Sequence, residues 1–217
     1  RSRHRFERRV EEIKTAIEDR IKVYEQVLQG ARGLFAASKS VERREWRDYL
    51  ESVEISKNYP GVAGVGFVSY VPRNKLQAYI SATRADGAPE FDVVPAGDRP
   101  EYLVITYIEP VEENPGLLGF DIGVDTASSL PAAELARDRG IPTISAKTVG
   151  VYGDERSAGF LFLLPVYRNI SSVETVEERR PALAGWIYCP FSLADLMKDI
   201  FGNSVQDIDF EIFDGID

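Results

Sequence analysis

The chain has 217 residues, of which 44% are hydrophobic and 28% charged, proportions that are ordinary for a globular protein with a sizeable core. Its net charge of −9 argues against nucleic-acid binding, which requires a dense basic face. The single cysteine, Cys189, excludes an internal disulfide and a multi-thiolate metal site. Its place in the apolar run WIYCPF predicts a small buried side chain.

No run of the sequence approaches the roughly eighteen apolar residues of a membrane-spanning helix. The chain opens with the charged stretch RSRHRFERR rather than with the apolar run of a signal peptide. Because it stops at Asp217 inside a strand-like pattern, we expect it to be a piece of a longer protein.

The first predicted element is a long amphipathic helix. Apolar residues recur at steps of three and four from Phe6 to Phe35, as on one face of a helix: Phe6, Val10, Ile13, Ile17, Ile21, Tyr24, Leu28, Ala31 and Phe35. A helix of about thirty-five residues would be ~50 Å long, more than the diameter of a small domain. We expect the half from Tyr24 onward to pack on its own domain. The first half has no obvious partner within the chain, so we expect it to form a coiled coil with a second copy.

A second helix is predicted from Ser40, as its N-terminal cap, to about Lys57. The stretch NYPGVAGVGFVSYVPR follows, and the chain is organised around it. Tyr59-Pro60 ends the helix, and the three glycines that follow predict a flexible turn. The apolar run from Val65 to Val71 then predicts a central strand. Pro72 closes this strand, and a third helix is predicted over 74–85.

The rest of the chain predicts alternating strands and helices. YLVITYIE at 102–109 and GFLFLLPVY at 159–167 are apolar on both faces, as strands covered on both sides should be. The other expected elements are a short strand at 91–95, an extended segment at 118–122, a helix at 130–139 ending at Gly140, a hairpin of 143–151 with 157–167, a linker at 169–178, a strand at 182–188, a helix at 192–201 and a strand at 207–213. The fold class is therefore predicted to be α+β, with two successive sheet-plus-helix units that divide near 168–180.

Motifs for catalysis or metal binding are weak. The only histidine, His4, lies in the charged leader, and no nucleophile motif such as GxSxG is present. The glycines of GVAGVG precede a strand instead of opening a helix, which argues against a nucleotide loop. Asp207, Asp209 and Glu211 alternate with apolar residues, as on a half-exposed edge strand, although a divalent-ion site is the alternative. We therefore predict no enzyme, no metal site and no cofactor.

A ligand pocket is suggested by polar residues on otherwise apolar strands, namely Thr106, Glu109 and Ser145. The Glu109 carboxylate must reach the strand end, find a hydrogen-bond donor or become neutral. Two interpretations stay open for it: contact with a ligand, and a solvated strand end before Pro110.

Several stretches resemble the CHASE domain, the extracytoplasmic sensor module of receptor histidine kinases and nucleotide cyclases. The similar segments, in family order, are VLQGARGLFAASKSVERREWRDYL, YPGVAGVGFVSYVPR, EYLVITYIEP, ARDRGIPTISAKTV, GFLFLLPVYR, TVEERRPALAGWIYCPF and DIDFEIFDG. They cover roughly residues 24–215 and look like the bacterial branch of the family, which is related to the plant cytokinin receptors.

The resemblance implies a stalk helix over 1–38, a membrane-distal PAS-like subdomain over 39–168 and a membrane-proximal PAS-like subdomain over 169–217. It also implies a homodimer through the N-terminal helix and two flanking transmembrane helices in the parent protein. The domain would then lie in the periplasm or outside the cell. A kinase or diguanylate cyclase would be the output domain.

By the same resemblance, a small organic molecule would bind in the distal subdomain. The positions of two ligand-contacting residues in the plant receptors correspond to Glu109–Pro110 and Ser145. The lining implied here is Tyr107, Glu109, Phe120, Ser145, Lys147, Phe160 and Phe162. Two rival hypotheses are a ligand-free structural or protein-interaction ectodomain and an enzyme that acts through Glu109 and Asp121, which would need two carboxyls facing one cleft.

Overall fold

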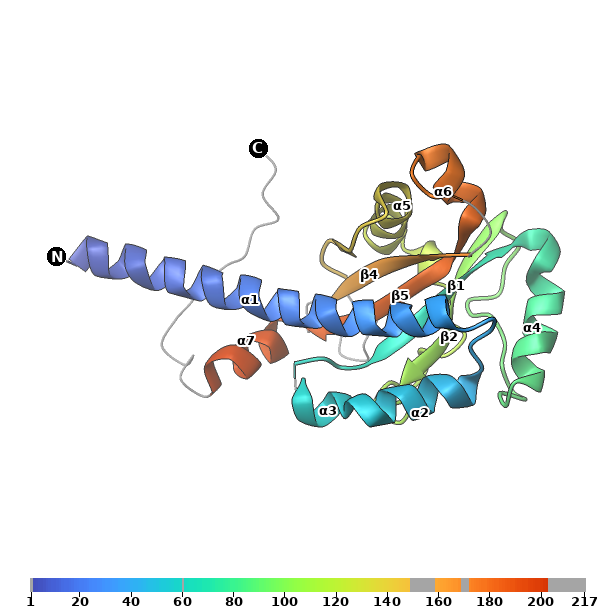
Figure 1. Ribbon diagram of the computed structural model, residues 1–217, viewed down its shortest axis with the longest axis horizontal. Coiled ribbons are helices and arrows are strands. Elements are labelled where there is room, and N and C mark those ends of the chain that lie inside the picture. The colour runs from blue at the N-terminus through green and yellow to red at the C-terminus, as the bar shows by residue number, and fades with distance from the viewer. Residues whose placement is uncertain (1, 60, 149–158, 169–171, 203–217) are drawn as a thin grey trace.

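The computed structural model describes residues 2–59, 61–148, 159–168 and 172–202. Within these ranges the fold is α+β, as predicted: helices flank one antiparallel sheet of five strands (Figure 1). The order across the sheet is β2 (Glu101–Glu109), β1 (Val65–Pro72), β5 (Leu183–Ser192), β4 (Gly159–Tyr167) and β3 (Thr143–Ile144). The predicted strand at 207–213, with its acidic residues, lies outside the described residues.

Helix α1 (Ser2–Ala37) confirms the long predicted helix. It crosses one face of the sheet and continues beyond it, so that its N-terminal part projects from the molecule (Figure 1). Tyr24 and Leu28 are fully buried, whereas Phe6 is 69% and Val10 48% exposed. The amphipathic stripe is thus covered by the chain itself only along the C-terminal part of α1.

Helix α7 (Leu193–Phe201) packs beside the middle of α1. Ile17 and Ile21 pack against the core at this place. The Asp199 carboxylate accepts a hydrogen bond from the Tyr24 hydroxyl at 3.2 Å and pairs with Arg20 at 3.1 Å. The expectation that the first half of α1 lacks a partner within the chain is therefore wrong from Ile17 onward, because α7 supplies that partner from a distant part of the sequence.

The predicted second helix is split into α2 (Arg43–Val53) and α3 (Ile55–Asn58). Glu54 adopts a left-handed conformation with φ of 51° and ends α2. The N-terminal cap is Glu42 rather than Ser40, since Glu42 and Glu45 form a reciprocal capping box. The short 3-10 helix η1 (Arg73–Lys75) and helix α4 (Leu76–Ala85) follow β1 where one helix was predicted.

Two predicted local structures differ from the observed ones. Residues 91–95 form no strand; Val94 makes only an isolated bridge to Phe120, with its N–H donating to Gly119 O at 2.9 Å. The predicted linker contains the start of α6 (Val176–Ala182), which Thr175 and Glu178 cap as a capping box. The remaining elements are η2 (Ile122–Val124) and α5 (Ser129–Arg139), which ends at Gly140 with φ of 71° as expected.

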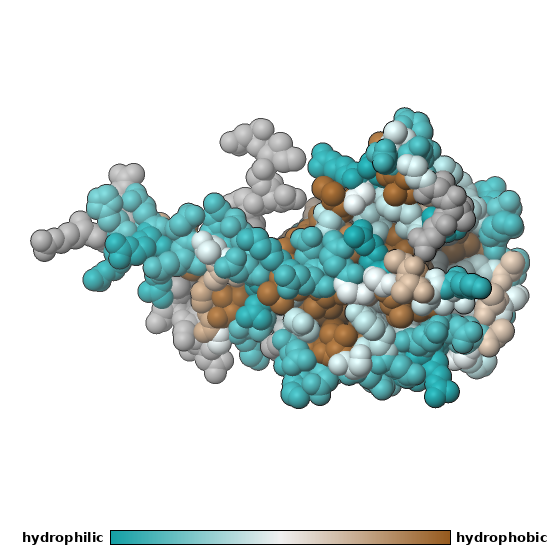
Figure 2. Space-filling view, in the orientation of Figure 1, coloured by the Kyte–Doolittle hydropathy of each residue, from teal (hydrophilic) through white to brown (hydrophobic). Residues whose placement is uncertain are grey.

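The sheet is covered on both faces. On one face, residues of α1, α2 and α7 pack with the sheet in a core cluster that includes Leu28, Trp46 and Phe67. On the other face, the alanines of α5 pack on Trp186. A smaller cluster lies between α4 and the ends of β1 and β2. Figure 2 shows a hydrophilic outer side of α1 and apolar residues between α1 and the α2–α3 segment.

The predicted domain boundaries stay predictions, because much of the last unit lies outside the described residues. Within the described part, β5 follows the predicted boundary at 168/169. It pairs with β1 on one side and with β4 on the other. This strand is therefore part of the same sheet as the strands of the 39–168 segment.

Candidate ligand site

A β-bulge in β2 shapes the part of the sheet that faces α2 and α4. Phe67 of β1 pairs with Tyr107 and Val68 pairs with Ile105, so the pairing skips Thr106. Such a bulge leaves one residue unpaired and re-aims its neighbours. The Tyr107 side chain packs in the same core cluster as Phe67, and the Thr106 hydroxyl meets the Tyr79 hydroxyl of α4 at 2.8 Å.

The Thr106 hydroxyl is the centre of a small polar network. It lies 2.5 Å from the Ser69 hydroxyl and donates to Val104 O at 3.2 Å. Burial raises the pKa of Tyr79, and its hydrogen bond with Thr106 opposes this rise. Hydroxyl groups that are satisfied in this way are tolerated inside an otherwise apolar layer.

Arg43 and Asp86 bring charge to the same place. The Asp86 carboxylate accepts from the backbone N–H of Arg43 at 3.0 Å and from the Tyr107 hydroxyl at 3.2 Å. The Arg43 guanidinium donates to Thr106 O at 3.0 Å and lies 5.1 Å above the centre of the Tyr107 ring. Burial, together with the Asp86 charge, raises the pKa of Tyr107. Tyr107 therefore keeps its proton and acts as a hydrogen-bond donor.

An aromatic wall adjoins these charges. Trp46 stacks on Tyr107 with ring centres 6.0 Å apart, and Phe35 stacks on Phe67 at 4.4 Å. Trp46 is fully buried, yet its indole N–H has no hydrogen-bond partner among the described residues. A buried donor without an acceptor costs about 1–3 kcal/mol, so an acceptor from a bound molecule would stabilise this position. We name Arg43, Trp46, Asp86, Thr106 and Tyr107 the sheet-face site.

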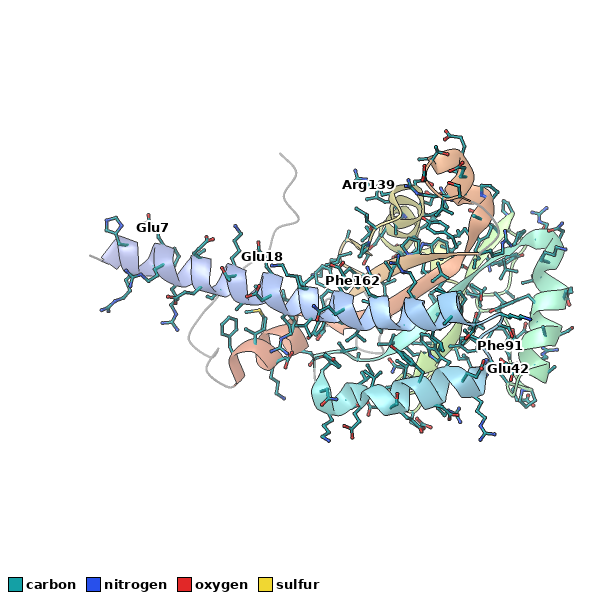
Figure 3. The ribbon with its side chains drawn as sticks, viewed as in Figure 1. Glu7, Glu18, Glu42, Phe91, Arg139 and Phe162 are labelled. Atoms are coloured by element: carbon teal, nitrogen blue, oxygen red, sulfur yellow. The ribbon has the colours of Figure 1, made fainter. Side chains whose placement is uncertain are left out.

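The seven residues of the predicted lining do not all lie together. Tyr107 and Phe162 share one core cluster, and Figure 3 shows Phe162 beside α1. Phe160 stacks on Phe191 at 5.6 Å at the border of that cluster. Phe120 packs against the cluster on the opposite face of the sheet, and Lys147 is exposed.

Ser145 and Glu109 have protein partners. The Ser145 hydroxyl accepts from the Leu161 N–H at 2.9 Å and donates to Ala146 O at 2.8 Å. The Glu109 carboxylate pairs with Arg47 at 3.2 Å and is 14% exposed. It lies at a groove of about 280 Å³ between α2–α3 and the end of β2. Glu109 thus stands at the strand end with Arg47 as its partner, and contact of its carboxylate with a ligand stays a prediction.

Reasoning from the sequence missed three members of the sheet-face site: Arg43, Trp46 and Asp86. A weak signal existed for Arg43, which stands at the start of an amphipathic helix one turn before the buried Trp46. Their approach to Tyr107 depends on the packing of α2 and α4 against β2, which no local pattern predicts. Figure 3 labels Glu42, which caps the start of α2, and Phe91, which lies in the segment after α4.

The comparisons with known proteins bear on this arrangement. The family model of the CHASE domain matches residues 39–217. The chain belongs to the CHASE domain family. No curated protein matches the chain. The CHASE domain is a sensory, extracytoplasmic domain of signalling receptors and not a catalytic one. In the described part of this CHASE domain, none of the helices is both long and apolar enough to cross a membrane.

The carboxyl pair of the enzyme hypothesis is not brought together in this CHASE domain. Asp121 is fully buried, pairs with Arg99 at 2.9 Å and accepts from the Leu103 N–H at 2.9 Å. Glu109 lies six residues after Leu103 on β2. At about 3.3 Å per residue, this places Glu109 ~20 Å from the Leu103 N–H that binds Asp121. Two carboxyls so separated do not face one cleft. Among the residues that the structure describes, no group of three or more metal-ligating side chains is placed to hold an ion.

Proposed function

We propose that this CHASE domain senses a small organic molecule that binds at the sheet-face site, and that it is part of a transmembrane signalling receptor. The observation that carries the proposal is the buried, unpartnered indole N–H of Trp46 beside the Arg43–Asp86–Tyr107 group. Small-molecule sites are mostly apolar, with a few convergent polar groups. The sheet-face site has this composition.

The chemistry of the site describes its ligand. The rings of Trp46 and Tyr107 offer flat apolar surface, which favours a planar or apolar body. The Trp46 N–H requires an acceptor on the ligand, and the Asp86 carboxylate can accept from a donor on it. The Arg43 guanidinium donates to the backbone oxygen of Asp86 at 3.2 Å and so already places a positive charge near the Asp86 carboxylate, which favours a neutral ligand. The PAS-like character of the sheet and the subdomains 39–168 and 169–217 are part of this proposal.

The test compares the two tryptophans of the chain. Trp46→Phe removes the unpartnered N–H together with part of a fully buried ring, so we expect a lower melting temperature and an affinity reduced by about 2- to 10-fold for the ligand that co-purifies with the native protein. The control, Trp186→Phe, removes the same part of a buried ring and also a hydrogen bond of 3.0 Å to Ala133 O, so it should lower stability at least as much and leave affinity unchanged.

Mass spectrometry of the native protein identifies the ligand, and tryptophan fluorescence measures its binding. In the Trp186→Phe variant, Trp46 is the only tryptophan, so its emission should change as ligand is added. Equal affinity of Trp46→Phe and the wild type would contradict the site. A native protein that carries no small molecule would favour the ligand-free structural ectodomain.

Signalling is proposed to pass through a dimer of stalk helices, with flanking transmembrane helices anchoring the parent protein. Phe6 and Val10 support this interface, because they are large apolar residues that α1 leaves exposed at helical spacing. The double variant Phe6→Ser/Val10→Ser should sediment as a monomer at concentrations where the wild type sediments as a dimer. Glu11→Gln, on the same part of α1, is the control. A dimer that persists in the double variant would reject this interface.

A further inference from the structure

A second pocket lies between the end of α1 and the end of β4, and its lining shares no residue with the sheet-face site. Figure 1 shows these two elements beside each other. Its volume is about 220 Å³, and it is lined by Arg32 and Ala36 of α1, Pro165, Val166 and Tyr167 of β4, and Arg168 and Val173. Typical sites for drug-sized ligands measure about 300–1,000 Å³, so an occupant here must be small. We name it the basic pocket.

The basic pocket is positively charged although the chain carries a net charge of −9. Two arginines line it, and none of the described lining residues is acidic. Arg168 donates to Pro181 O, which holds its guanidinium in place. Arg32 is half-buried, and its guanidinium makes no hydrogen bond or ion pair with any described residue. An incompletely solvated guanidinium without a counter-charge is the group that an anion stabilises.

Neighbouring groups preserve this positive charge. The Tyr167 hydroxyl donates to Arg137 O, so it does not compete for the arginines. Burial raises the pKa of Tyr167, and the charges of Arg179, Arg137 and Arg32 oppose that rise. Asp138, whose negative charge also acts on Tyr167, is already paired with Arg137 at 2.7 Å and with Arg180 at 2.7 Å.

We propose that the basic pocket binds the carboxylate of a small organic acid between Arg32 and Arg168. Guanidinium groups bind carboxylates with two parallel hydrogen bonds, and a pair of them matches one planar anion. Ala36, Pro165, Val166 and Val173 form an apolar wall that suits the body of an organic acid better than a fully hydrated phosphate ion. The bound acid bridges α1 to the sheet, at the end of α1 opposite to the projecting part.

The test is a titration of the 15N-labelled full chain, followed by NMR. The probes are propionate and benzoate, with propionamide and benzamide as neutral controls of the same shape and with inorganic phosphate as a second anion. We expect the carboxylates to shift the Val166 and Val173 amides and the Arg32 side-chain N–H signal in a saturable manner at concentrations up to ~10 mM. The amides of the probes should leave these signals unchanged.

Two variants then test whether the charge of Arg32 is responsible for carboxylate binding. Arg32→Gln should weaken carboxylate binding at least ~10-fold, whereas Arg5→Gln, which removes the same charge from the exposed part of α1, should leave it unchanged. Three results would overturn the proposal: no saturable shift in the wild type, equal shifts with the neutral amides, or binding of phosphate but not of carboxylates. The wild-type titration decides the matter even if Arg32→Gln fails to fold. Signals of the basic pocket and of Trp46 are separate, so the proposed sensor function is tested independently.

Discussion

Replacing Gly66 by alanine tests the close packing of the central strand. A Cβ atom added at Gly66 would lie well under 3.0 Å from Tyr188 Cε1 of β5 and from the carbonyl oxygen of Tyr107 in β2. The Tyr107 oxygen is backbone of a strand that pairs with β1, and the Tyr188 ring is fully buried, so neither has room to move aside. Only a residue without a side chain fits this position.

The cost of Gly66→Ala follows from this geometry. Overpacking in a core costs about 1–3 kcal/mol, and the upper end applies here because one of the obstacles is backbone. For a domain of this size, 1 kcal/mol shifts the melting temperature by about 2–4 °C. We therefore expect a loss of ~3 kcal/mol and a decrease of about 6–12 °C, measured by circular dichroism during heating and by urea unfolding.

Gly33→Ala is the matched control. Gly33 is an exposed position within α1, where an added Cβ would meet no atom within 4 Å. Alanine there should stabilise the protein by about 0.5–1 kcal/mol, because glycine is the poorer helix former. If Gly66→Ala melted at the wild-type temperature, the close approach of β2 and β5 to β1 at this position would be wrong.

Three further predictions concern other contacts. Asp199→Asn should destabilise the protein by about 1–3 kcal/mol in urea unfolding, since its 6% exposed side chain accepts from Tyr24 and pairs with Arg20. Asp138→Asn should be less stable than the wild type at neutral pH. Hydrogen bonds from Arg180 lower the pKa of Asp138 below its ordinary 3.8, so the difference should shrink as the pH falls below 3.8. The Cys189 thiol should not react with Ellman's reagent in the native protein and should react in urea, because burial raises its pKa.

Each of these has an outcome that contradicts it. Lys198→Gln changes an exposed charge on the same helix as Asp199, and equal stability of the two variants would show that the contact to α1 contributes nothing. A constant difference between Asp138→Asn and the wild type from pH 7 to pH 3 would reject the lowered carboxyl pKa. Rapid labelling of Cys189 without denaturant would show that β5 is not covered on that face.

Much of the secondary structure can be predicted from local sequence patterns. The stripe from Phe6 to Phe35 predicted α1, and the runs with apolar residues on both faces predicted β2 and β4, because periodicity depends only on which residues must face a core. The family resemblance was likewise visible in the sequence and is confirmed over 39–217. The sequence also contains the capping box of Thr175 and Glu178, although these residues were predicted to lie in a linker.

The arrangement of these elements was decided by contacts between distant segments. The amphipathic pattern of α1 cannot tell α7 from a second copy of the chain as its partner, since either would bury Ile17 and Ile21. Alternation along strands likewise does not tell which face α1 covers, and so it could not separate Phe120 from Phe162. The bulge that skips Thr106 shifts the alternation by one residue within β2.

The sequence by itself determined the fold class, the long N-terminal helix, the main strands and the CHASE family, because each depends on local periodicity or on a series of motifs. Only the tertiary structure decided that Arg43 and Asp86 meet Tyr107 beside the unpartnered Trp46 N–H, and that Arg32 and Arg168 line one pocket. These residues are brought together by the packing of helices against the sheet. Contacts between segments that are distant in the sequence produce no periodic pattern from which they could be predicted.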